Sequence, residues 1–177
     1  MEEEDLDESP RDGDGGILPL LIDATLPVLH ASSPAAVNAR GRAWRALMLE
    51  TGITAVKAAG SCPYSTDAAR GLDWAFRCDW RRLFGDLRAL GLPEIAFGNA
   101  AGEATALASA WLVAGGGGTV CSLGGEGGLP DLVELRLLLH VRGIMPMRAP
   151  DTDVRRIREL GGSMKGGIRG PFVVRAA

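Results

Sequence analysis

The chain has 177 residues, of which 46% are hydrophobic and 23% are charged, and its formal net charge is -3. This composition excludes an intrinsically disordered chain and predicts a globular protein with a substantial core. The three cysteines are odd in number and have no short metal-ligand spacing, which argues against a disulfide framework and favours a reducing, intracellular compartment, the cytoplasm.

The charge is divided unevenly along the chain. Residues 1–15 contain eight acidic residues and one arginine, a net charge of -7, so residues 16–177 carry +4. We therefore expect residues 1–15 to form an acidic, disordered tail and residues 16–177 to form a single globular domain. The start of the chain lacks the basic and apolar segments of a signal peptide, and its most apolar run is too short to span a membrane, so we expect no membrane association.

The first apolar segment, residues 17–30, contains Pro19 and Pro27. Proline cannot donate a hydrogen bond to a sheet ladder, which argues against a central strand here. We expect a short helix that starts near Pro19, or an extended segment that lies across the core. The next segment opens with Ser33 and Pro34, a typical helix start, and its apolar positions then repeat at helical spacing. We expect a helix over 34–51.

The longest stretch with one period runs from residue 65 to residue 90. Its apolar residues follow one another at steps of three and four, which places them on one helical stripe: Leu72, Phe76, Trp80, Leu83, Leu87 and Leu90. We expect a core helix, or two helices in tandem, over 66–90, with its arginines facing solvent.

The second half of the chain contains alternating short elements. Residues 132–142 alternate apolar and polar side chains, which predicts a strand that pairs with 119–123 in a hairpin across the glycine turn 124–128. The leucine-rich stretch 131–140 also fits a helix, and that alternative stays open. The full prediction is an α+β fold in which three to four helices (34–51, 66–90, 101–114, 152–160) pack with a small, mainly antiparallel sheet (94–97, 119–123, 132–142 and an optional strand at 171–175).

One junction is a candidate ligand site. Gly98, Asn99 and Gly102 lie between an expected strand and an expected helix, where free backbone N–H groups attract anions. The spacing matches neither the dinucleotide-binding nor the P-loop pattern, and Glu103 in the first turn would repel phosphate. A plain helix start is the alternative reading of these residues.

Other chemistry finds little support in the sequence. Metal binding would have to gather cysteines and histidines from distant parts of the chain, without the close ligand pair that zinc sites normally contain. We predict no catalytic residue, no metal site and no cofactor. Surface interaction is the remaining candidate, through one off-stripe tryptophan and two arginine clusters: Trp74, Arg77, Arg81, Arg82, Arg88, Arg155 and Arg156.

Three functions follow from these features. The favoured one is a non-enzymatic interaction or structural protein that uses helix and strand surfaces to bind a protein partner or a second copy of itself. The first alternative is a nucleic-acid-binding protein whose acidic tail covers an arginine-rich face. The second is a small enzyme or ligand-binding domain that uses the helix start at residues 98–103.

Overall fold

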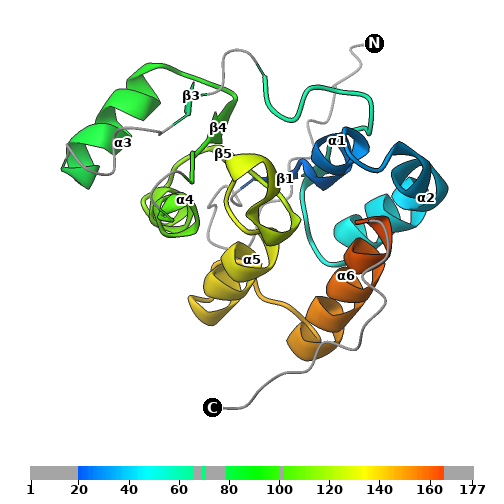
Figure 1. Ribbon diagram of the computed structural model, residues 1–177. Helices are drawn as coiled ribbons and strands as arrows, with labels where there is room; N and C mark the ends of the chain where they lie inside the picture. Colours follow the sequence, from blue (N-terminus) through cyan, green and yellow to red (C-terminus); the bar gives the residue numbers. More distant parts are fainter. Residues whose placement is uncertain (1–19, 66–68, 71–78, 100–101, 166–177) are drawn as a thin grey trace, which may run out of the picture.

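The computed structural model describes residues 20–65, 69–70, 79–99 and 102–165 (Figure 1). Its centre is a five-stranded sheet with the strand order β2-β1-β5-β4-β3. Every neighbouring pair of strands in this sheet is parallel. The strands are β1 (Leu21–Asp23), β2 (Ala55–Val56), β3 (Ala69–Arg70), β4 (Glu94–Ala96) and β5 (Gly118–Cys121). The predicted α+β fold with an antiparallel sheet is therefore wrong, and the described residues form a parallel α/β fold.

Six α-helices and one 3-10 segment pack around this sheet in the described part of the chain. They are α1 (Thr25–His30), α2 (Pro34–Glu50), α3 (Trp80–Ala89), α4 (Ala104–Val113), η1 (Leu123–Gly128), α5 (Leu132–Val141) and α6 (Pro150–Met164). The helix predicted over 34–51 is confirmed as α2, and α4 lies within the predicted 101–114. The helix predicted over 152–160 is longer than expected, because α6 begins at Pro150 and continues through Gly161 and Gly162.

The predicted strand over 132–142 is wrong, because these residues form α5. The Asp131 side chain accepts a hydrogen bond from Glu134 N at 2.8 Å, which caps the first turn. Leu132, Leu135 and Leu139 are buried, and this spacing of three and four residues is helical. Leucine also favours a helix intrinsically, so the helical alternative was the correct one.

The long helix predicted over 66–90 is also wrong in extent. Within the described residues it is reduced to α3, and Ala69–Arg70 form strand β3. Leu83 and Leu87 are buried as expected, but Trp80 is 41% exposed and Leu90 is 58% exposed. Within the described part of the predicted stripe, Leu83 and Leu87 therefore face the core and Trp80 and Leu90 do not. Leu72 and Phe76 lie outside the described residues, as do the predicted tail 1–15 and the optional strand 171–175.

Strand β1 contradicts the expectation that the proline-containing segment 17–30 would avoid the centre of the sheet. β1 pairs with β2 on one side and with β5 on the other. Pro27 does not interfere because it lies in the first turn of α1, where a backbone N–H has no partner within the helix.

The two faces of the sheet are covered differently. The connections β1–β2, β3–β4 and β4–β5 step in the same direction across the sheet, so right-handed crossovers place their helices on one face. The core on that face joins Leu21 and Phe97 of the sheet region to Trp44 of α2, Leu107 of α4 and Leu135 of α5. On the other face, a smaller cluster includes Ile22, Ala96 and Val120, with Tyr64 from the β2–β3 connection packed against it. None of the described helices is both long and apolar enough to cross a membrane.

Candidate functional site

Asp23 is the last residue of β1, and its side chain is completely buried. Its carboxylate accepts hydrogen bonds from Thr25 N at 2.9 Å, from Thr25 Oγ1 and from Trp44 Nε1 at 2.6 Å. Burial raises the pKa of Asp23 above its ordinary value, although these hydrogen bonds act in the opposite direction. Because both carboxylate oxygens already accept hydrogen bonds inside the core, Asp23 anchors α1 and α2 to the end of β1.

Thr25 extends this network to the glycine-rich segment η1. Its Oγ1 accepts a hydrogen bond from Leu123 N at 2.9 Å, so one hydroxyl joins Asp23 to the start of η1. Cys121 is equally buried at the end of β5, and burial, reinforced by the negative charge of Asp23, raises the pKa of its thiol well above the ordinary value. A neutral thiol in this position is a packing residue and not an activated nucleophile.

The loops after β4 and β5 meet at the carboxyl edge of the sheet. Asn99 N donates to Gly128 O at 3.0 Å, which joins the two loops directly. The Asn99 Oδ1 accepts from Ala104 N at 3.1 Å, near the start of α4. This bond orients the amide so that Nδ2 lies 3.9 Å from the point where a Cβ on Gly125 would lie. Asn99 is exposed, and its side-chain amide donor therefore stands at the surface beside η1.

The segment η1 has an unusual backbone. Gly124, Gly125, Gly127 and Gly128 all have φ between 67° and 70°, a conformation that strains any residue with a Cβ. These four glycines leave the carboxyl edge of the central strand β5 free of bulky side chains. The one side chain in the turn, Glu126, pairs with Lys165 at the end of α6 at 2.7 Å. A cation and a carboxylate thus flank the glycine turn.

An ion pair lies on the face of the sheet that carries the smaller cluster with Ile22, Ala96 and Val120. Lys57 Nζ pairs with Glu94 Oε2 at 2.9 Å, and the Glu94 carboxylate also accepts from Ser65 N. The two charged side chains are 20% and 9% exposed, so this ion pair is largely desolvated. The Glu94 carboxylate therefore binds the connection after β2 at two points, Lys57 and Ser65. The Ser65 Oγ is buried and finds no hydrogen-bond partner within the described part of the chain.

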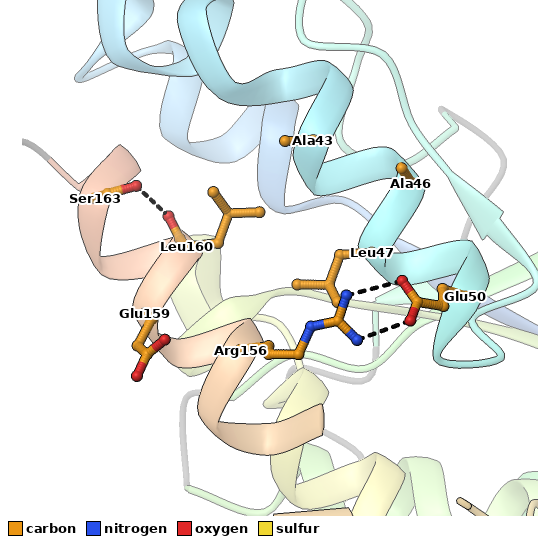
Figure 2. A pocket seen from close by; sticks show the side chains of 8 residues that line it. All are labelled: Ala43, Ala46, Leu47, Glu50, Arg156, Glu159, Leu160 and Ser163. Carbon is orange, nitrogen blue, oxygen red and sulfur yellow. Dashed lines mark hydrogen bonds and ion pairs between the residues drawn. The ribbon is translucent and has the colours of Figure 1, made fainter. Parts of the chain in front are cut away.

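A groove of about 570 Å³ lies between α2 and α6 (Figure 2). The two helices run side by side at one end of the molecule (Figure 1). Figure 2 shows the ion pair between Arg156 and Glu50 bridging the groove, with distances of 2.8 and 2.9 Å for its two hydrogen bonds. The residues that line it are Ala43, Ala46, Leu47, Glu50, Arg156, Glu159, Leu160 and Ser163.

The predicted ligand residues Gly98, Asn99 and Gly102 do lie at a strand-to-helix junction. Gly98 is buried, whereas Asn99 and Gly102 are exposed, and Gly102 has a φ of 78°. Glu103 is the residue before α4 and makes no capping hydrogen bond through its side chain. The junction therefore lies between a strand and a helix as expected. Its exposed amide belongs to Asn99, and its neighbour is η1, which the sequence pattern had assigned to the turn of a hairpin.

Among the described residues, no contact joins the predicted interaction residues to one another. Trp74 and Arg77 lie outside the described residues. Arg81, Arg82 and Arg155 are exposed. Arg88 donates to Ala114 O and lies 5.4 Å from the centre of the Trp111 ring.

Arg156, the remaining member, pairs with Glu50. Two of the arginines are thus engaged within the chain.

Sequence reasoning missed the buried polar residues. The isolated acid in the apolar run Leu20 to Leu26 was a usable signal for Asp23, since an acid there is either buried with partners or ends a strand. No comparable signal marks Arg136, which is buried in α5. His140 accepts a hydrogen bond from Met147 N at 3.0 Å through Nδ1, which fixes the ring locally. Within the described residues, no three His, Cys, Asp or Glu side chains are grouped closely enough to hold a metal ion.

Comparisons of this chain with protein-family models, with curated proteins and with solved structures found no match.

Proposed function

We propose that this protein binds a small polar ligand at the carboxyl edge of its sheet, between Asn99 and the glycine turn 124–128. Parallel sheets bind ligands outside the carboxyl ends of their strands, because the loops there vary without disturbing the core. An antiparallel hairpin would have offered no such edge. Because the sheet is parallel, the loops that follow β4 and β5 lie at the same edge of the sheet.

The hydrogen bond from Asn99 N to Gly128 O carries the proposal. It holds the loops of two neighbouring strands, β4 and β5, against one another. The Asn99 Oδ1 is committed to Ala104 N, so its Nδ2 is the donor available to a ligand over Gly125. The positive φ values of this turn favour glycine at these positions. Because glycine has no side chain, a ligand can also approach the backbone of the turn closely.

The charges beside the turn favour a ligand that carries hydrogen-bond acceptors. Lys165 Nζ lies 3.0 Å from the point where a Cβ on Gly124 would lie, and it pairs with Glu126. Lys165 is 28% exposed and Glu126 is 45% exposed, so this pair is weak and a ligand carboxylate or phosphate can replace Glu126. Asn99, beside Gly125, and Lys165, beside Gly124, would then donate to the same ligand.

Thermal unfolding with a panel of probes tests this site. The probes are inorganic phosphate, pyrophosphate, citrate, succinate and adenosine nucleotides, each at millimolar concentration. A probe at about one hundred times its Kd adds about 2.7 kcal/mol to the stability, which corresponds to a Tm increase of about 5–10 °C for a chain of this size.

The variant Asn99→Asp separates ligand binding from folding. It keeps an oxygen acceptor for Ala104 N but replaces the amide donor by a charged oxygen, so it should abolish the Tm increase. The matched control is Asn38→Asp, the same chemical change at an exposed position of α2, which should retain it. A panel without any Tm increase, or an increase that survives Asn99→Asp, would overturn the proposal.

A second candidate is an interaction protein that associates with itself. It is supported by the exposed large hydrophobic side chains Leu49, Trp80, Leu90, Val113, Leu138 and Val141, of which Val141 is 81% exposed. A contact between two copies would remove such apolar surface from water, which favours association. Size-exclusion chromatography with light scattering should detect a dimer that Val141→Glu or Leu90→Glu dissociates. A strict monomer at high concentration would remove this candidate.

A further inference from the structure

The groove between α2 and α6 is hollow because of the small side chains on its α2 side. Ala43 and Ala46 stand where longer residues would fill the space between the helices. Leu47 and Leu160 add apolar surface, and Figure 2 shows both among the side chains around the opening. A groove with this lining favours an occupant with apolar side chains.

The chain itself supplies a segment with that chemistry at the rim of the groove. Ser163 lines the groove, and α6 ends at Met164 with Lys165 as its C-cap. The next residues are Gly166 and Gly167, a pair that permits a sharp reversal of direction. The sequence then continues with apolar and basic residues: Ile168, Arg169, Phe172, Val173, Val174 and Arg175.

Residues 168–175 are long enough to run back along the groove from the end of α6. From Ser163 back to Arg156 the helix axis advances about 10 Å, at about 1.5 Å per residue. Three or four extended residues cover that distance at about 3.3 Å each. Residues 168–175 therefore have more than enough length to run along the whole groove.

The charge of the groove selects this segment over the other end of the chain. Arg156 is neutralised by its bidentate pair with Glu50, whereas Glu159 has no ion-pair partner among the described residues. The groove therefore presents a net negative charge. Residues 168–175 contain two arginines and no acid, whereas residues 1–15 carry a net charge of -7.

We propose that the groove between α2 and α6 is the docking site of residues 168–175 of the same chain. Phe172 and its apolar neighbours occupy the space over Ala43 and Ala46, and Arg169 or Arg175 faces Glu159.

Disulfide trapping in the full chain tests the proposal. In a background carrying Cys62→Ser and Cys78→Ser, the pair Ala46→Cys with Phe172→Cys should form an intramolecular disulfide in oxidised glutathione at micromolar protein concentration. The control pair is Arg45→Cys with Phe172→Cys, because Arg45 is exposed on α2 but does not line the groove. We expect the pair at position 46 to close at least tenfold faster than the control pair.

A charge variant provides a second readout. Glu159→Lys should slow closure of the pair at position 46 several-fold, and Glu134→Lys, an exposed change on α5, should leave its rate unchanged. Equal closure rates for positions 45 and 46 would overturn the proposal. Disulfide-linked dimers in place of the intramolecular product would also overturn it, because the occupant would then be a second copy of the chain.

Discussion

Arg136 of α5 caps the carboxyl end of α2 by donating to the backbone oxygen of Thr51. Its Nε and Nη2 lie 3.3 and 3.1 Å from Thr51 O, and the guanidinium also donates to Met145 O and to Pro146 O. Arg136 is 4% exposed, and burial lowers the pKa of its guanidinium. A single buried side chain thus joins α2, α5 and the connection to α6 through carbonyl groups that would otherwise lack donors.

Replacement of Arg136 should destabilise the fold. Arg136→Met removes the charge and leaves the buried carbonyls of Thr51 and Met145 without their donor, which costs about 3 kcal/mol in the free energy of unfolding. Urea denaturation with an unchanged m-value would measure this loss. Arg142→Met is the control, because Arg142 is an exposed residue at the end of the same helix. Equal stability of the two variants would contradict the capping role.

Asp23 should give the protein a distinctive pH dependence. Because burial raises the pKa of Asp23 above 3.8, the folded protein retains this proton at pH values where the unfolded chain has lost it. The contribution of Asp23 is therefore fully present below the unfolded pKa and is lost as the pH rises through the folded pKa. The free energy of unfolding of the wild type, relative to that of Asp23→Asn, should fall as the pH rises above the ordinary pKa of an aspartate, about 4. A difference that stays constant or grows with pH would contradict the assignment.

Trp44→Phe tests the same network from its other side. Trp44 Nε1 donates to Asp23 Oδ2 at 2.6 Å and favours the ionised carboxylate. Phenylalanine keeps much of the packing but removes this donor, so the pKa of Asp23 should rise further and the pH window should extend upward. We expect a loss of about 2 kcal/mol at neutral pH from the unpaired carboxylate oxygen. Unfolding at a series of pH values measures both effects.

The largely buried ion pair Lys57–Glu94 and the exposed ion pair Arg156–Glu50 should contribute differently to stability when the glutamate of each is replaced by glutamine. Glu94→Gln leaves Lys57 without its partner on the second face of the sheet, and it should destabilise the protein by about 2 kcal/mol. Glu50→Gln breaks the exposed pair with Arg156, and it should leave the free energy of unfolding unchanged within error. Denaturation of both variants at low and high salt tests this contrast. A larger effect of Glu50→Gln would contradict it.

Two adjacent glycines of α6 should have opposite effects when replaced by alanine. A Cβ on Gly161 would overlap Leu123 Cδ2 and lie 3.2 Å from the Trp44 ring, so Gly161→Ala should cost about 1–3 kcal/mol. A Cβ on Gly162 meets no atom within 4 Å, so Gly162→Ala should stabilise the helix by up to about 1 kcal/mol. Thermal unfolding of both variants measures the difference. Stabilisation by Gly161→Ala would show that α6 does not pack closely on Leu123.

Local signals determined several helices and one junction of this protein. Ser33 and Pro34 mark the start of α2, and the junction at Asn99 was identified because a strand, a turn and a helix follow one another within a few residues. These features depend on neighbouring residues, so the amino-acid order contains them directly.

The tertiary structure alone decided the sheet and its polar network. The strands contain only two to four residues, too few for a hydrophobic period to distinguish parallel from antiparallel pairing, and the leucines of α5 fit both periods. The links from Asp23 to Trp44 and from Arg136 to Thr51 join residues far apart in the sequence, and their partners exist only once the helices have packed. A carboxylate or guanidinium is buried where the fold supplies donors or acceptors for it, and no local pattern of residues records where that will be.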